Sequence, residues 1–342
     1  MIDKINSILK CNFCESAFEL VSKLDDKKPL AETCIQCISC KKKYSIIDDV
    51  LFLENKTQKN SVKYQSDVYS YWWKSSHKNI TYDDEKNKKI FSSTISFNLE
   101  KINNLVVLDA GCGNGRFSKI ISNYNPSLFI IVDISDGIFE AKKYLKDRNI
   151  NYLAIKGDIS EIPFKDEVVD FVYSWGVIHH TEDPQKTFKN ICRVVKKSGT
   201  LGIYVYKNNP DYKYNNLILR FFYILRQILI ILPLRYICKF LSKKNVKRLF
   251  VPIFYFEKFI NYGIVGCHSN SGDKFNKEDY FRVVIDRFKT GYASEHQELE
   301  VATWFYNHGF NDLVFGTFPK IGVTATKFAN QIKKIKININ VE

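Results

Sequence analysis

Three glycines that follow an apolar run are the residues of this chain whose types and spacing say most about its chemistry. The run Leu105-Val-Val-Leu-Asp109 is typical of a buried parallel strand. Gly111, Gly113 and Gly115 come directly after it, and a helical pattern follows. Glycines allow a tight turn whose backbone a ligand can approach closely. The pattern predicts the start of a nucleotide-binding βα unit. The final Gly-x-Gly pair fits a nicotinamide dinucleotide less well than Gly-x-x-Gly would.

A second acidic residue ends the next apolar run. Leu128-Phe-Ile-Ile-Val-Asp133 predicts another strand, and Asp133 lies 18 positions after Gly115. Nucleotide-binding folds place a carboxylate about 20 positions after the glycine loop, where it accepts hydrogen bonds from ribose hydroxyls. We therefore expect Asp133 to bind a ribose.

Three further strands complete the pattern of alternating strands and helices. Residues 152–156 precede Gly157-Asp158-Ile159, residues 168–174 precede Trp175, and residues 196–206 follow another helix. This alternation indicates an α/β fold with a parallel sheet.

Two adjacent histidines follow the fourth of these strands. His179 and His180 lie in a loop at the carboxyl edge of the sheet, where such folds bind ligands. Imidazole titrates near neutrality, so either residue could act as a general base. We expect one to face the site and the other to brace the loop. We favour His180 because it is farther from the buried strand. Tyr292 and His296 are secondary candidates.

Together these motifs resemble the class I S-adenosylmethionine-dependent methyltransferases. The resemblance covers about residues 105–206, and a later stretch from Asp286 to Phe310 is similar to the C-terminal part of one bacterial branch. It implies a doubly wound, Rossmann-like sheet of seven strands and a methyltransferase that uses S-adenosylmethionine. The matching pieces, in the family's order, are Leu108-Asp-Ala-Gly-Cys-Gly-Asn-Gly-Arg-Phe, Val132-Asp-Ile-Ser, Gly157-Asp-Ile-Ser-Glu-Ile-Pro-Phe and Val177-Ile-His-His-Thr-Glu-Asp-Pro.

The resemblance also assigns parts of the cofactor to residues. Asp109 and the loop from Gly111 to Gly115 would hold its amino-acid part, Asp133 its ribose, and Asp158 with Ile159 its adenine. The expected cofactor-binding residues are Asp109, Gly111, Cys112, Gly113, Gly115, Asp133, Ile134, Asp158, Ile159 and Trp175.

Two C-x-x-C pairs near the N-terminus have the spacing of a zinc ribbon. Cys11 and Cys14 are separated from Cys37 and Cys40 by 22 residues, and four protein thiolates make a structural zinc site. Cys34 leaves an alternative, in which Cys34 and Cys37 form the second pair. We prefer Cys37 and Cys40, because the sequence after Cys40 resembles the tail of small zinc-ribbon domains joined to methyltransferases.

The composition of the chain bears on its expected cellular compartment and on its binding partners. No early segment has the layout of a signal peptide, so we expect a cytoplasmic protein whose 9 cysteines do not form a disulfide framework. The net charge of +14 raises the possibility of nucleic-acid binding. Many of the lysines are scattered, however, and their clusters are not interleaved with aromatics. We therefore favour a solvated basic surface over an RNA groove.

The residues from 217 to 232 predict an amphipathic helix that Pro233 ends. It would be about 24 Å long, short of a bilayer core of about 30 Å. In order of preference, it packs as an extra helical layer, forms a lid over an apolar substrate, or attaches to a membrane surface.

These observations divide the chain into six expected parts. They are a zinc-ribbon-like module (1–54), a helical linker that covers the cofactor (55–104), the S-adenosylmethionine-binding core (105–206), a helical insertion or lid (207–285), the C-terminal part of the sheet with a closing hairpin (286–328) and a basic tail (329–342).

The function that we expect is methyl transfer to a small-molecule or lipid-like acceptor, with structural zinc. One alternative is an RNA base methyltransferase, since some of those carry an N-terminal zinc module. Another is a non-catalytic scaffold that binds the cofactor. The acceptor atom and the oligomeric state stay open.

Overall fold

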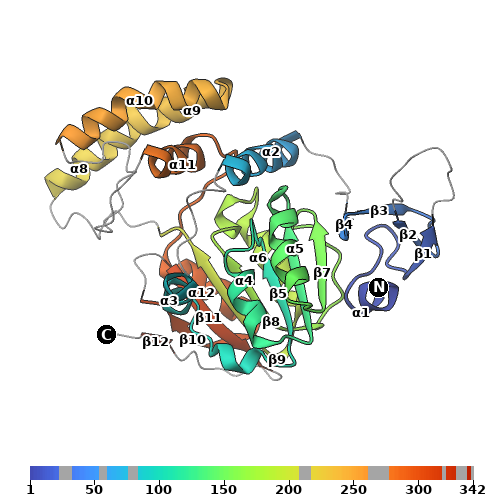
Figure 1. Cartoon of the computed structure of the whole chain (residues 1–342). Helices are drawn as coiled ribbons and strands as arrows, with labels where there is room; N and C mark the ends of the chain where they lie inside the picture. The colour runs from blue at the N-terminus through green and yellow to red at the C-terminus, as the bar shows by residue number, and fades with distance from the viewer. Residues whose placement is uncertain are drawn as a thin grey trace, which may run out of the picture. The chain divides into compact units, whose positions relative to one another are not determined.

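The structure is a computed structural model that describes residues 1–22, 33–53, 60–75, 84–207, 217–260, 277–317, 321–328 and 337–339. Two compact units divide the chain: residues 1–207 with 294–342, and residues 208–293. The first contains the sheet and the second is helical in its described part (Figure 1). Parts of the expected linker and most of the expected basic tail lie outside the described residues.

In the part of the first unit that the structure describes, 12 strands form one sheet in the order β1-β2-β3-β4-β7-β6-β5-β8-β9-β11-β10-β12. From β7 to β10 this order is that of a doubly wound sheet, parallel except for β11, which is antiparallel to β9 and β10. The predicted Rossmann-like fold is confirmed, as is the closing hairpin. The strands are β1 (Phe18–Ser22), β2 (Thr33–Cys37), β3 (Lys43–Ile47), β4 (Val50–Phe52), β5 (Val106–Ala110), β6 (Leu128–Asp133), β7 (Tyr152–Lys156), β8 (Val169–Trp175), β9 (Val195–Val205), β10 (Phe310–Phe315), β11 (Ile321–Lys327) and β12 (Ile337–Ile339).

The central strands are buried on both faces, which explains their continuous apolar runs. All residues of β6 are buried. Alternate side chains of a strand point to opposite faces, and the sheet accordingly has an apolar cluster on each side. Leu108, Ile130 and Val172 belong to one cluster, whereas Val107, Phe129 and Phe171 belong to the other.

Helices cover the sheet and cap its edges in the first unit (Figure 1). The helix α6 shows how the sequence starts one: Asp183 accepts a hydrogen bond from the backbone of Lys186, and Pro184 occupies the first turn. The α-helices are α1 (Ile2–Ile8), α2 (Asn60–Ser75), α3 (Asp84–Thr94), α4 (Ser118–Ile121), α5 (Gly137–Asp147), α6 (Pro184–Val194) and α12 (Glu298–Asn307), and the short 3₁₀ helices are η1 (Leu99–Ile102), η2 (Ser122–Tyr124) and η3 (Ile178–His180).

The N-terminal module extends the sheet. Its last strand, β4, pairs in parallel with β7, and Leu9 forms an isolated bridge with Phe164. The backbone amide of Lys165 also donates to the carbonyl of Ile8 at 2.8 Å. The module is therefore joined through backbone hydrogen bonds to the strand and the loop that carry Asp158 and Ile159.

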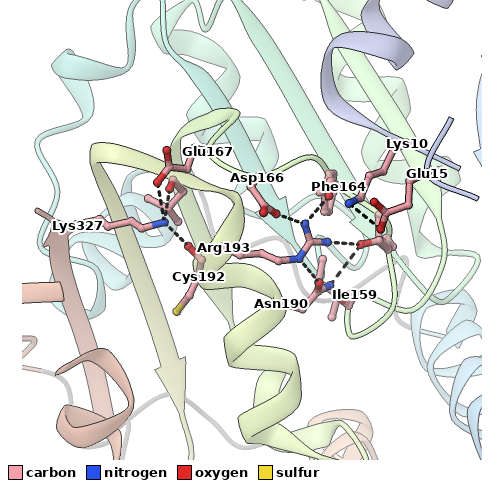
Figure 2. A network of polar contacts seen from close by, with 12 residues as sticks. Lys10, Glu15, Ile159, Phe164, Asp166, Glu167, Asn190, Cys192, Arg193 and Lys327 are labelled. Carbon is pink, nitrogen blue, oxygen red and sulfur yellow. Dashed lines mark hydrogen bonds and ion pairs between the residues drawn. The ribbon is translucent and has the colours of Figure 1, made fainter. Parts of the chain in front are cut away.

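The loop after β7 is tied to the helix α6 by a polar network (Figure 2). Asn190 donates to the carbonyl of Ile159 at 2.7 Å, and Arg193 donates to Asn190 at 2.9 Å and to the carboxylate of Asp166 at 2.6 Å. Arg193 also donates to the carbonyl of Phe164. Hydrogen bonds to backbone carbonyls satisfy groups that the irregular loop leaves unpaired. The network therefore fixes the loop that carries Ile159.

The second unit begins with one nearly continuous helix. α8 (Leu217–Arg226) runs through a π-helical segment, η4 (Gln227–Ile231), into α9 (Leu232–Phe240). The prediction that Pro233 ends this helix is wrong. Pro233 lies in the first turn after the π-helical segment, and proline is tolerated there because its missing N–H is not needed.

Two more helices complete the described part of the second unit, α10 (Lys243–Ile260) and α11 (Lys277–Phe288). Lys289, after α11, donates to the carbonyls of Cys238, Lys239 and Leu241 at 2.9, 2.9 and 2.7 Å. These carbonyls lie at the end of α9, where a helix lacks internal donors. Lys289 is thereby joined to α9, and the compact unit runs to Ala293. Among the described residues, no helix is both long and apolar enough to cross a membrane.

Candidate active site

The glycine loop follows β5 at the carboxyl edge of the sheet. Gly111, Gly113 and Gly115 have φ angles of 98°, 54° and 83°, a region that favours glycine. A Cβ on Gly111 would lie 2.3 Å from Val177, and one on Gly115 would lie 2.6 Å from the backbone of Ala141. The glycines are therefore needed both for the backbone conformation and for the close packing around the loop.

Asp109 lies beneath this loop and is buried. Its carboxylate accepts hydrogen bonds from the hydroxyls of Ser118 at 2.6 Å and Tyr173 at 2.7 Å. Burial raises the pKa of Asp109 to about 7, although these two hydroxyls lower it. Asp109 thus joins β5, α4 and β8 in this structure.

Asp133 lies at the end of β6, next to the glycine loop. Its carboxylate accepts from the backbone amide of Gly113 at 2.7 Å and from the amide and hydroxyl of Ser135 at 2.8 and 2.6 Å. Burial raises its pKa, while these donors lower it. An ionised carboxylate has about four acceptor positions, so these three donors leave Asp133 about one position for a ligand hydroxyl.

The two expected adenine-binding residues follow β7. Asp158 accepts from the amide and hydroxyl of Ser160 at 2.9 and 2.8 Å, and Ile159 is buried. The amide of Gly157 donates to the carbonyl of Asp133 at 3.0 Å. This bond brings the ends of β6 and β7 together, so Asp133 and Asp158 lie on neighbouring strand ends.

Cys112 and Trp175 are held by protein groups. Burial raises the pKa of the Cys112 thiol well above its ordinary value. The thiol is therefore protonated, and a protonated thiol is a poor nucleophile. The Trp175 indole donates to the hydroxyl of Thr94 at 3.0 Å and stacks on Tyr204 with ring centroids 4.3 Å apart. In this structure Trp175 braces α3 against the sheet.

The helix α2 covers the carboxyl edge of the sheet. Ser66 donates to the carbonyl of Ile134 at 2.8 Å, and the hydroxyl of Ser70 accepts from the amide of Asp136 at 2.9 Å. A Cβ on Gly113 would lie 2.2 Å from Cζ2 of Trp73. The Trp73 indole therefore lies directly against the glycine loop.

The sequence predicted a helical linker over residues 55–104 that covers the cofactor, but it did not single out Trp73 as a site residue. Serine and aromatic residues at helical spacing in α2 were the available signal. These residues indicate that one face of α2 packs against the protein, but they do not indicate which loop that face contacts.

The two histidines after β8 are both buried. The ring of His179 lies 3.9 Å from that of Tyr206, and its carbonyl accepts from Ser294. The carbonyl of His180 accepts from Gln65 of α2 at 3.2 Å, and its ring lies edge-on to Tyr69. His180 is thus the one that contacts the covering helix α2.

His296 uses both ring nitrogens within the protein. Its Nε2 lies 2.8 Å from the hydroxyl of Ser294, and its Nδ1 lies 2.9 Å from the carboxylate of Glu300. Glu300 also belongs to the capping box at the start of α12. These contacts describe a residue that braces the loop before α12. Tyr292 belongs to the second unit.

Four cysteines of the N-terminal module gather in one cluster. The sulfur atoms of Cys11, Cys14, Cys37 and Cys40 all lie within 4.8 Å of one another. Zn–S bonds of about 2.3 Å in a tetrahedron give S···S distances near 3.8 Å, so the cluster has the size that zinc requires. Cys34 lies outside the cluster, and its thiol contacts the carbonyl of Val21.

Comparison with known proteins agrees with this geometry. Residues 108–203 match the family model described as a methyltransferase domain. A sterol 24-C-methyltransferase of Clavispora lusitaniae is 29% identical over 167 residues, which are 46% of this chain and 44% of that protein. A tRNA (carboxymethyluridine(34)-5-O)-methyltransferase of Saccharomyces cerevisiae is 33% identical over 91 residues, which are 26% of this chain and 30% of that protein.

A solved structure of a methyltransferase from Aquifex aeolicus that depends on S-adenosylmethionine is also similar. It is 16% identical, covers 72% of this chain and 99% of its own, and has a TM-score of 0.38. The chain spans less than half the length of the curated sterol methyltransferases that it matches. Residues 108–203 thus match a methyltransferase domain, which confirms for this segment that the motifs resemble those of methyltransferases.

Proposed function

We propose that this protein transfers the methyl group of S-adenosylmethionine to a lipid-like acceptor. The observation that carries the proposal is the glycine loop from Gly111 to Gly115, held by Asp133 within a methyltransferase domain. Bound S-adenosylmethionine supplies an electrophilic methyl group on a sulfonium. The protein then mainly has to align an acceptor with that methyl group.

The residues around the loop fit such a cofactor. The loop from Gly111 to Gly115 has positive φ at its three glycines and carries no side chain there, so its backbone can be approached by the amino-acid part of the cofactor once Trp73 gives way. Asp133 has acceptor capacity for ribose hydroxyls. Asp158 and Ile159 follow β7, the strand beside β6. An adenine attached to a ribose at Asp133 would lie beside these two residues. Trp73 bounds the same space, so a bound cofactor would contact its indole or displace it.

The lipid-like acceptor is supported by the relatives. Sterol 24-C-methyltransferases of several yeasts match between 31% and 46% of this chain. The yeast tRNA methyltransferase and the net charge of +14 favour the second candidate, an RNA acceptor. We rank RNA second because its supporting match covers 26% of the chain.

For an acceptor that must lose a proton, His180 is the proposed general base. It follows β8 at the ligand-binding edge and contacts α2, whereas the ring nitrogens of His296 are engaged by Ser294 and Glu300. General-base catalysis contributes roughly 10²–10⁴-fold. Replacing His180 with Ala should therefore lower turnover by about this factor and leave cofactor affinity nearly constant.

We also propose that Cys11, Cys14, Cys37 and Cys40 hold a structural zinc ion. Four protein ligands leave no open position for substrate, which is typical of structural zinc. We expect the bound ion to stabilise the folded module, as in other small zinc modules.

Methyl transfer from labelled S-adenosylmethionine tests the acceptor class. The full chain is incubated with a total lipid extract and, separately, with total RNA, and label is counted in each fraction. Label in the lipid fraction supports the proposal. Label in RNA alone establishes the second candidate. Cofactor binding with no transfer to lipid, RNA or small metabolites would instead favour a scaffold.

A further inference from the structure

The second unit presents an apolar helix face to solvent. Of the 20 exposed large hydrophobic side chains among the described residues, 10 lie between Phe221 and Phe240. Six of them recur every three or four residues and so share one helix face. These six residues, with their exposed fractions, are Phe222 (58%), Leu225 (36%), Leu229 (63%), Leu232 (56%), Tyr236 (67%) and Phe240 (75%). We call them the apolar face of α8–α9.

The opposite side of the same helix faces the interior of the unit. Ile231 and Cys238 are buried, and the carbonyl of Cys238 accepts from Lys289. The helix therefore already has a packed face within its own unit. Monomeric soluble proteins rarely leave a second, contiguous face of this kind exposed, and such faces mark interaction sites.

The positive charge of this part of the chain indicates an anionic partner. Between residues 217 and 260 the chain has nine Lys and Arg residues and one acidic residue, Glu257, for a net charge of +8. Glu257 is only 1% exposed, so no acidic side chain is exposed in the described part of this stretch. The basic residues are Arg220, Arg226, Arg235, Lys239, Lys243, Lys244, Lys247, Arg248 and Lys258.

We propose that the apolar face of α8–α9 lies on the surface of a membrane that contains anionic lipids. Apolar and aromatic side chains on one helix face, beside a strongly basic stretch, are the features of helices that lie in a membrane interface. Phe240 ends α9, and Lys243, Lys244, Lys247 and Arg248 follow in α10, where they can meet anionic headgroups.

Other partners fit these observations less well. A second copy would bring its own charge of +8 against this one, and like charges disfavour such contacts. RNA would contact the basic residues but would leave the apolar face in water. A lipid surface satisfies both features at once. The inference does not depend on which molecule accepts the methyl group.

Flotation of the full chain with vesicles tests this proposal. The vesicles consist of phosphatidylcholine alone or of phosphatidylcholine with phosphatidylserine. We expect binding to the anionic vesicles, weaker binding to the neutral ones, and a decrease with added salt. The combined change Leu229→Ser and Phe240→Ser should weaken binding by at least about ten-fold, because both side chains would be buried in the interface.

Matched control variants distinguish binding through this surface from non-specific adsorption to vesicles. Leu299 and Tyr306 are exposed apolar residues of α12 in the other unit, and Leu299→Ser with Tyr306→Ser should leave binding unchanged. Lys244→Glu with Arg248→Glu should weaken binding to anionic vesicles, whereas Lys189→Glu with Lys197→Glu in the first unit should have less effect. Unchanged melting temperatures would show that the variants fold.

Three results would overturn the proposal. One is no binding of the folded wild-type chain to anionic vesicles. Another is equal binding of the Leu229→Ser, Phe240→Ser variant and wild type. The third is a dimer of the wild-type chain that this variant dissociates, without any binding to vesicles, since that would assign the apolar face to a second copy.

Discussion

At the scale of single residues, two buried carboxylates hold the proposed cofactor site. Asp109 accepts hydrogen bonds from two hydroxyls beneath the loop, and Asp133 accepts from the amide of Gly113 within it. Only Asp133 lies beside the loop surface on which we propose that the cofactor lies. Asp109 therefore has an architectural role, and we assign the binding role to Asp133.

Asp133→Ala should weaken binding of S-adenosylmethionine by about 1–3 kcal/mol, because the ribose hydroxyls and the Gly113 amide would lose their acceptor. Titration calorimetry measures this change. Asp183→Ala is the control, since the Asp183 carboxylate caps α6 and its loss should leave cofactor affinity unchanged. An unaltered affinity of the Asp133 variant would remove this residue from the ribose-binding role.

Asp109 should make the stability of the protein depend on pH. Its pKa is raised from an ordinary value of 3.8 to about 7 in the folded state, so the folded state holds a proton that the unfolded state has already lost. Its contribution to stability is present at low pH, falls as the pH rises from about 4 to about 7, and is level above that.

Asp109→Asn removes this titration. The difference in unfolding free energy between wild type and variant should shift in favour of the variant by up to about 4 kcal/mol across this pH range. Urea unfolding at several pH values measures it. A difference that stays constant with pH would show that Asp109 is ionised throughout in the folded protein.

At the scale of elements, the sequence predicted a helical linker over the cofactor but not the contacts by which α2 reaches the glycine loop. Side chains of α2 form hydrogen bonds with backbone groups after β6 and β8, and Trp73 lies on Gly113. Strand and glycine-loop positions could be predicted because burial and backbone conformation restrict the residue types there. Helix docking depends on contacts between distant residues, which no local pattern records.

Trp73 should report cofactor binding through its fluorescence. A cofactor on the glycine loop must contact or displace its indole, so S-adenosylmethionine should change the tryptophan emission of the wild-type chain. Trp73→Phe should lose most of this change while calorimetry still detects binding. Trp304→Phe serves as the control, because Trp304 is buried beside His296 and Phe188. A full response from the Trp73 variant would contradict this placement.

The cysteine cluster should hold one zinc ion per chain. Cys34→Ser should retain it, because Cys34 lies outside the cluster, whereas Cys37→Ser should lose it. Zinc binding of about 10–16 kcal/mol in small modules implies that the metal-free module unfolds. Metal analysis of the purified variants measures the zinc content. Loss of zinc from Cys34→Ser with retention in Cys40→Ser would assign the metal to the other cysteine pair.

Two features of the elements could not be predicted from the sequence: the continuation of the helix past Pro233 and the pairing of β4 with β7. Proline usually ends a helix, but Pro233 follows a π-helical segment whose altered hydrogen bonds accommodate it. No local sequence pattern predicts the parallel pairing of β4 with β7. The two strands lie far apart in the sequence and are not joined by a short turn, as the strands of a hairpin are.

At the scale of the whole molecule, the chain combines a methyltransferase sheet with a second unit, residues 208–293, that is helical in its described part. The zinc-ribbon-like module continues the sheet at one edge through β4, beside the strand that leads to Asp158. The proposed metal site therefore supports the same region of the sheet that would bind the cofactor. The helical unit supplies the proposed membrane surface.

A crystal structure of the full chain with S-adenosylhomocysteine would test the central claim most directly. The account predicts the amino-acid part of the ligand against the loop from Gly111 to Gly115, the ribose hydroxyls within hydrogen-bond distance of Asp133, and the adenine beside Asp158 and Ile159. A ligand bound elsewhere, or bound with Asp133 making no contact to the ribose, would contradict it.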